Sequence, residues 1–185
     1  MREESTDLER SCWMEIEAKF LIGGREDFLK ALRVLEEHGY RPLPYGKVRY
    51  SDTYYDPGDG GALRFREYED GRVVRTYKRD RKTEEGVIYR EESEREVSRE
   101  EMRGEVEGTK PILQTLTVRE RYVSGEVQIT YDVVWYDDAT QMAFLEVEGP
   151  EEDVKRVARI LKDAGFKPES KSKLAIGLSL KGRGA

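Results

Sequence analysis

Residues 13 to 22 read WMEIEAKFLI, a stretch in which apolar and charged side chains alternate. This alternation predicts a β-strand, because successive side chains of a strand point to opposite faces. The apolar face consists of Met14, Ile16, Ala18, Phe20 and Ile22. The other face carries Glu15, Glu17 and Lys19. Antiparallel sheets commonly expose one face to water, so this strand alone allows either a solvated face or a charged site.

Other segments repeat the pattern, and their charges are sorted by sign. Basic pairs occupy one face at Arg64 and Arg66 and again at Arg119 and Arg121. Later strands carry the acidic pair Glu146 and Glu148 and the single acid Asp132, while Lys78 shares a face with Thr76. A solvated face would tolerate mixed signs equally well. The sorting therefore favours a functional surface.

The remaining patterns predict the rest of the secondary structure. Helices are expected at 25–38 and 151–164, where apolar residues recur at helical spacing. Ser98 and Glu101 have the spacing of a capping box that opens a short helix. Further strands are expected at 48–56, 62–69, 72–79, 87–97, 117–125, 126–137 and 141–149. Residues 1–12 are expected to be a flexible tail, and 13–181 a single domain.

Composition excludes several classes of function. The chain has 185 residues and a net charge of -6, which argues against nucleic acid or an anionic membrane as its main partner. The basic run at 75–82 is expected to be a solvated hairpin tip. No apolar run is long enough to span a membrane and the first residues do not resemble a secretory signal, so we expect a cytoplasmic protein. The single cysteine excludes an internal disulfide and a thiolate metal cluster, and the single histidine argues against a histidine-based charge relay.

A sheet that is charged on one face and apolar on the other could close into a barrel. The charges would then line the lumen, and helices would cover part of the outside, giving an α+β fold with a closed or nearly closed barrel. Buried like charges are costly unless a ligand neutralises them. Clustered carboxylates bind a hard cation such as Mg²⁺ or Mn²⁺, while arginine and lysine bind anions with several oxygens. The sequence therefore predicts a site for a metal-bound polyphosphate.

The segment MEIEAKF resembles the ExExK signature of the CYTH superfamily, the triphosphate tunnel metalloenzymes. This family includes class IV adenylyl cyclases, thiamine triphosphatases and inorganic triphosphatases. The similarity continues in order through DTYYD, LRFRE, TYKR, YREESEREV, VRERY, ITYDVV, FLEVEG and KSK, from Glu15 to Lys173. It implies an eight-stranded antiparallel tunnel, with helices packed outside, that binds a triphosphate end-on together with a divalent metal.

The resemblance also implies roles for individual residues. Glu15, Glu17 and Lys19 would form the catalytic signature. The expected metal ligands are Glu15, Glu17, Asp132, Glu146 and Glu148. The expected phosphate-binding cations are Lys19, Arg64, Arg66, Lys78, Arg119 and Arg121, together with Lys171 or Lys173, which share a face if the segment is a strand. Arg90 and Glu92 fit the family's mixed tunnel strand.

The leading hypothesis from the sequence is a metal-dependent hydrolase of tripolyphosphate or of a nucleoside or thiamine triphosphate. Lys19, deprotonated or acting through Tyr54 or Tyr55, could help to activate the attacking water. An adenylyl cyclase is the first alternative, although ERSCWM lacks the His-Phe pair of the cyclase motif. The second is a module that binds polyphosphate or nucleotide without turnover. The partner is in each case a small-molecule triphosphate; oligomeric state stays open, a homodimer included.

Overall fold

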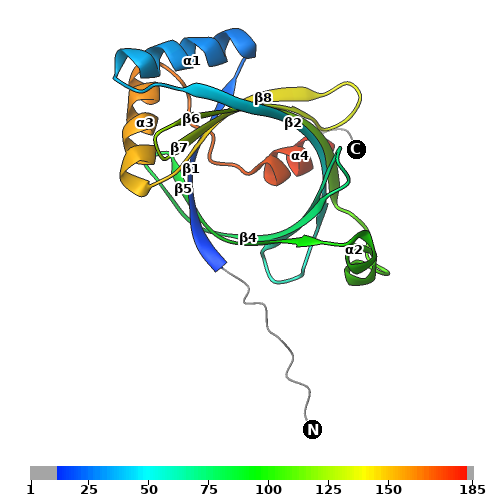
Figure 1. Cartoon of the computed structure of the whole chain (residues 1–185). Helices are drawn as coiled ribbons and strands as arrows, with labels where there is room; N and C mark the ends of the chain where they lie inside the picture. The colour runs from blue at the N-terminus through cyan, green and yellow to red at the C-terminus, as the bar shows by residue number, and fades with distance from the viewer. Residues whose placement is uncertain (1–11, 183–185) are drawn as a thin grey trace.

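The computed structural model describes residues 12–182 (Figure 1). The expected tail at 1–12 falls mostly on residues 1–11, which lie outside the described residues, and Cys12 already belongs to the first strand. The strands are β1 (Cys12–Ile22), β2 (Leu43–Tyr55), β3 (Ala62–Tyr68), β4 (Val73–Glu84), β5 (Val87–Val97), β6 (Leu113–Ser124), β7 (Val127–Trp135) and β8 (Gln141–Glu148). The helices are α1 (Arg25–Glu37), α2 (Arg99–Glu105), α3 (Glu151–Asp163) and α4 (Lys173–Lys181).

Within the described residues, the eight strands form one closed antiparallel barrel in the order β1-β5-β4-β3-β2-β6-β7-β8 (Figure 1). The ring closes where β1 pairs with β5 on one side and with β8 on the other. This confirms the α+β barrel that the segregated charges predict. It also gives every strand a hydrogen-bonded neighbour on each side.

The strand register directs the charged faces inward. Lys19 lies opposite Glu146 and Glu17 lies opposite Glu148 across the β1–β8 pair. The alternate residues, such as Phe20 and Leu145, point outward and are fully buried under α1 and α3. Both helices lie side by side on the outside of the barrel (Figure 1). Burying this outer face against helices is what leaves the lumen as the charged side.

The chain ends its described part with α4, which lies in the barrel opening in Figure 1. Ile176 of α4 packs against Tyr54, Leu113 and Phe144, all on lumen-facing strand positions. This segment is a helix and not a strand, so Lys171 and Lys173 do not share a strand face. The sequence pattern is ambiguous here, because the apolar residues Leu174, Ile176, Leu178 and Leu180 alternate as they would in a strand. The closed barrel has no free edge to pair with, and Ser172 caps the helix by accepting a hydrogen bond from the Ala175 amide at 3.0 Å.

Several strands are longer than the sequence predicts, among them β2, β4 and β6. The basic run at 75–82 lies within β4 and not at a hairpin tip, with a register shift between Asp80 and Lys82. The actual turn is Glu85-Gly86, where both residues have positive φ. β2 begins at Leu43 because its first residues pair with the end of β6. In the part of the chain that the structure describes, every helix is too short or too polar to cross a bilayer.

Candidate functional site

The lumen of the barrel contains a cavity of about 550 Å³. Its wall is made mainly by the inward residues of the strands, and α4 contributes Ser172, Lys173 and neighbouring residues. The structure gathers most of the sequence-predicted site residues here. They are Glu15, Glu17, Lys19, Tyr54, Arg64, Arg66, Lys78, Arg90, Glu92, Arg119, Glu146, Glu148 and Lys173.

Three carboxylates form an acidic cluster on one part of this wall. Glu15 and Glu17 of β1 and Glu148 of β8 each place an oxygen within 4.8 Å of the other two. Burial, together with the charge of Glu15, raises the pKa of Glu148 to about 8. The cluster offers only oxygen ligands. These residues fit a hard divalent cation such as Mg²⁺ or Mn²⁺.

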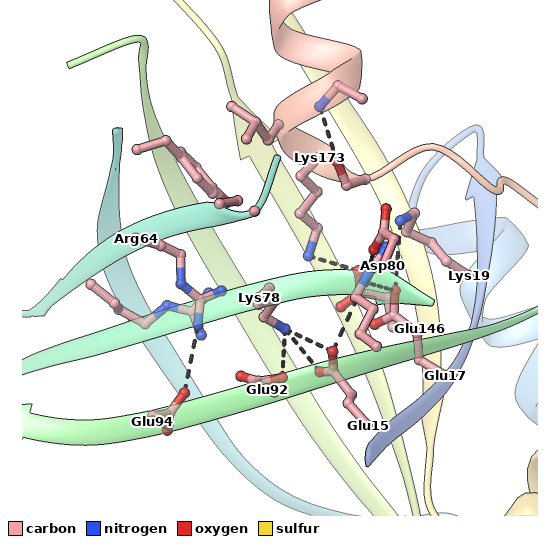
Figure 2. A pocket seen from close by; sticks show the side chains of 18 of the residues that line it. Glu15, Glu17, Lys19, Arg64, Lys78, Asp80, Glu92, Glu94, Glu146 and Lys173 are labelled. Atoms are coloured by element: carbon pink, nitrogen blue, oxygen red, sulfur yellow. Dashed lines mark hydrogen bonds and ion pairs between the residues drawn. The ribbon is translucent and has the colours of Figure 1, made fainter. Parts of the chain in front are cut away.

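Cations surround the acidic cluster (Figure 2). Lys78 donates hydrogen bonds to both carboxylate oxygens of Glu15 at 2.9 Å and lies 2.9 Å from Glu92. Arg90 contacts Glu17 and donates through Nε to Asp80 at 2.5 Å. The acidic signature of β1 is therefore held by basic residues from β4 and β5.

Asp132 and Glu146 belong to a different cluster. Asp132 is fully buried and receives hydrogen bonds from Arg119, at 2.7 Å to Nε, and from Lys173. Glu146 contacts the same two cations, with Lys173 Nζ at 2.9 Å. Burial alone would lower the pKa of Lys173, but Asp132 and Glu146 raise it. In this arrangement the two acids hold Arg119 and Lys173 toward the cavity and stand apart from the acidic cluster.

Lys19 lies deep in the wall between these clusters. Its side chain is 1% exposed, and its Nζ is 3.8 Å from Glu17. Burial lowers the pKa of Lys19, while the charges of Glu17 and Glu146 oppose this change. Lys19 is therefore a poorly solvated amine in a position to meet an anion.

Arg64 and Arg66 of β3 are supported by Asp52 of β2. Asp52 accepts hydrogen bonds from Arg66 Nε at 2.8 Å and Nη2 at 2.9 Å, and lies 3.9 Å from Arg64. Burial would raise the pKa of Asp52, but Arg66 and Arg64 lower it to about 2. The ring of Tyr50 lies 3.6 Å from the Arg66 guanidinium carbon. Both arginines are thus fixed in the wall before any ligand binds.

Some guanidinium nitrogens of the barrel wall have no hydrogen-bond partner among the described residues. Arg64 Nε and Arg90 Nη2 are buried and, among the residues described, have no hydrogen-bond partner. Leaving a buried donor unpaired is costly, so such groups call for a partner that the protein itself does not supply. Both residues line the cavity, which is where an anion with several oxygens would meet them.

Other expected residues lie elsewhere. Lys171 is exposed and lies outside the cavity, and Arg121 packs over the ring of Tyr45 at 4.5 Å. Tyr55 contacts Phe65 on the outer face. Tyr54 does face the lumen, where burial and the charge of Asp52 raise its pKa to about 12. At neutral pH this tyrosine keeps its proton and can donate a hydrogen bond.

The sequence reasoning missed several cavity residues and their supports. Asp52 stood inside the DTYYD motif with no role assigned, although it shares strand parity with Tyr50 and Tyr54. Asp80 lines the cavity from within β4, whereas the sequence pattern predicts that this strand ends at residue 79. Trp13 was treated only as the start of the first strand. Parity along β1 and β2 was the available signal for Trp13 and Asp52.

The fold and this constellation agree with a comparison against protein families. The CYTH domain matches residues 14–175, and the chain belongs to this family. No match was found among curated protein sequences.

Solved structures share the fold at low sequence identity. The PH1012 protein from Pyrococcus horikoshii is 23% identical, with a TM-score of 0.65 over 86% of this chain and 97% of that one. A protein from Hippeastrum, described as a candidate adenylyl cyclase with a dominant triphosphatase activity, is 21% identical, with a TM-score of 0.59 over 89% and 95%. A candidate adenylate cyclase from Vibrio parahaemolyticus is 17% identical, with a TM-score of 0.63 over 90% and 98%.

Proposed function

We propose that this protein is a divalent-metal-dependent hydrolase that cleaves the terminal phosphate from a triphosphate bound inside the barrel. The observation that carries the proposal is the meeting, in one cavity, of an acidic cluster with unpartnered guanidinium donors. A cation and a polyanion are the two ligands that satisfy these groups together. Membership of the CYTH family supports the same class of substrate.

The cationic residues would bind and orient the phosphates. Arg64 and Arg66 are fixed by Asp52, and Arg119 and Lys173 by Asp132 and Glu146. Each of these cations therefore loses little conformational freedom when phosphate binds, which favours tight positioning. Lys19 would hold the phosphate nearest the acidic cluster. A water molecule would attack its phosphorus in line with the bridging oxygen that leaves.

A divalent cation held by Glu15, Glu17 and Glu148 would neutralise phosphate charge and polarise the bond that breaks. The three carboxylates would do the binding, while Lys78 and Arg90 keep Glu15 and Glu17 in position. The lumen residues thus supply electrostatics and orientation, and the chemistry requires no histidine.

A panel of substrates tests this function. Tripolyphosphate, ATP and thiamine triphosphate are each incubated with Mg²⁺ or Mn²⁺ and assayed for orthophosphate, pyrophosphate and cyclic AMP. We expect many turnovers of orthophosphate release from at least one substrate. Cyclic AMP and pyrophosphate as the main products from ATP would replace the hydrolase by the cyclase, a reaction named for structures of this fold.

The same panel separates an enzyme from a binding module. A binder would gain thermal stability from tripolyphosphate by mass action and release no product with either metal. The double variant Lys19→Ala/Arg64→Ala serves as the control, because both side chains line the cavity. Any phosphate release that persists in this control at the wild-type rate would come from a contaminating phosphatase.

A further inference from the structure

We propose that Trp13 stacks on a planar organic group attached to the triphosphate, so that the preferred substrate is an aromatic triphosphate ester and not inorganic tripolyphosphate. This inference rests on the proposed triphosphate site and names its substrate class. Trp13 lines the same cavity as the charged residues, on the same strand. Its side chain nevertheless offers a ring and an indole N–H where the neighbouring positions offer charges.

Trp13 lies on β1 directly beside the acidic cluster, two residues before Glu15. Trp13 and Glu15 are two residues apart on the same strand face, which corresponds to about 6.5 Å along a strand. Beyond Glu15 the same face continues with Glu17 and Lys19. A triphosphate whose phosphates meet these charges and whose ester end points back along β1 would bring that end to the indole.

Exposure of Trp13 also requires an explanation. The residue is 42% exposed, although large aromatic side chains usually bury most of their surface. Among the described residues, the aromatic ring pairs do not include Trp13. Trp13 therefore keeps exposed side-chain surface at the cavity, where a ligand can contact it. Stacking of a base on an aromatic side chain is sequence-tolerant and common where a charged groove holds phosphates.

The test compares Trp13→Ala with a matched control, Met14→Ala. Met14 is the adjacent residue, is 48% exposed and lies on the opposite strand face, outside the cavity lining. kcat/KM is measured for ATP, thiamine triphosphate and tripolyphosphate. The dissociation constant of the β,γ-methylene analogue of ATP gives a second readout that does not depend on turnover.

We expect Trp13→Ala to lower kcat/KM about tenfold for at least one organic triphosphate and to leave tripolyphosphate within twofold, since only the organic substrates lose a stacked ring. The affinity for the ATP analogue should fall in parallel if ATP is the affected substrate. Trp13→Phe should restore most of the loss because it keeps a ring, and Met14→Ala should resemble the wild type.

Equal losses on organic and inorganic triphosphates, or no loss on either organic substrate, would overturn the stacking role. In that case hydrolysis of tripolyphosphate by the wild type would leave the proposed function intact. A wild type that neither binds nor cleaves any of the three compounds would instead overturn the proposed function, and the role of Trp13 with it.

Discussion

Asp52 accepts two hydrogen bonds from the guanidinium group of Arg66, at 2.8 Å and 2.9 Å, while both residues are buried in the barrel wall. This buried ion pair therefore fixes the position of Arg66 in the barrel wall, and the carboxylate of Asp52 is shielded from solvent. Removing one partner of a buried ion pair leaves the other charge uncompensated, at a cost of about 3 to 5 kcal/mol.

Asp52→Asn should raise KM for the triphosphate about tenfold or more, because a charge-assisted hydrogen bond worth about 1.5 to 3 kcal/mol no longer holds Arg66 toward the phosphates. Steady-state kinetics and thermal unfolding measure the two consequences separately. Asp70→Asn is the matched control, since Asp70 pairs with Arg72 at 2.8 Å on the surface. Exposed pairs contribute little, so the control should behave as wild type. Similar KM values for the two variants would contradict the role of Asp52.

Acid should destabilise the protein partly through Asp52. The folded-state pKa of this residue is lowered from 3.8 to about 2, so its ionised form stabilises the fold above pH 3.8 and that contribution is lost as pH falls toward 2. The shift corresponds to about 2 kcal/mol. Urea unfolding at pH 5, 4, 3 and 2 should show a steeper decline of the free energy of unfolding in the wild type than in Asp52→Asn. Parallel declines would contradict the assignment.

The two acids of the β8 signature should behave differently. Glu148→Gln should raise the Mg²⁺ concentration for half-maximal activity about tenfold or more, because Glu148 belongs to the acidic cluster. Glu146→Gln should mainly raise KM, because Glu146 contacts Arg119 and Lys173. Mg²⁺ titrations at saturating substrate distinguish the effects. This division of roles would be rejected if Glu146→Gln raised the Mg²⁺ requirement while Glu148→Gln raised only KM. Full turnover of the wild type in excess chelator would reject it as well.

Lys171 and Lys173 provide a matched pair of variants. Lys173→Ala should lower kcat/KM about tenfold to a hundredfold through loss of a charge-assisted contact with phosphate. Lys171→Ala should stay within twofold, because Lys171 is exposed and lies outside the cavity. Activity assays at low and high salt check that the difference persists when surface charge is screened. Equal losses would place the anion outside the barrel.

Much of the fold could be predicted from alternation alone. Strand parity along β1 and β8 correctly assigned Glu17, Lys19 and Glu146 to one surface. A closed barrel is favoured because it encloses the charged face of the sheet and leaves the apolar face for the helices to cover. The secondary structure of the terminal segment was harder to predict, because Leu174, Ile176 and Leu178 fit both the strand and the helix periodicity. Only the presence of a closed barrel, which leaves no edge to pair with, decides for the helix.

Within the site, sequence reasoning identified charges but not their partners. Asp132 and Glu148 are both acids on lumen-facing positions, yet one is neutralised by Arg119 and Lys173 and the other repels Glu15. That difference depends on which side chains meet across the barrel, which local patterns do not encode. Asp52 illustrates the same limit, since its partner Arg66 comes from a neighbouring strand.

Closure of the ring between β1 and β8 has a consequence for how the protein is made. β1 leaves the ribosome first, but its pairing partner at residues 141–148 is synthesised more than a hundred residues later. Such distant pairings carry a large entropic cost and form slowly. Lys19 cannot face Glu146, nor Glu17 face Glu148, before that last strand arrives. The nascent chain therefore acquires its charged lumen only after residues 141–148 have been synthesised and β8 has paired with β1.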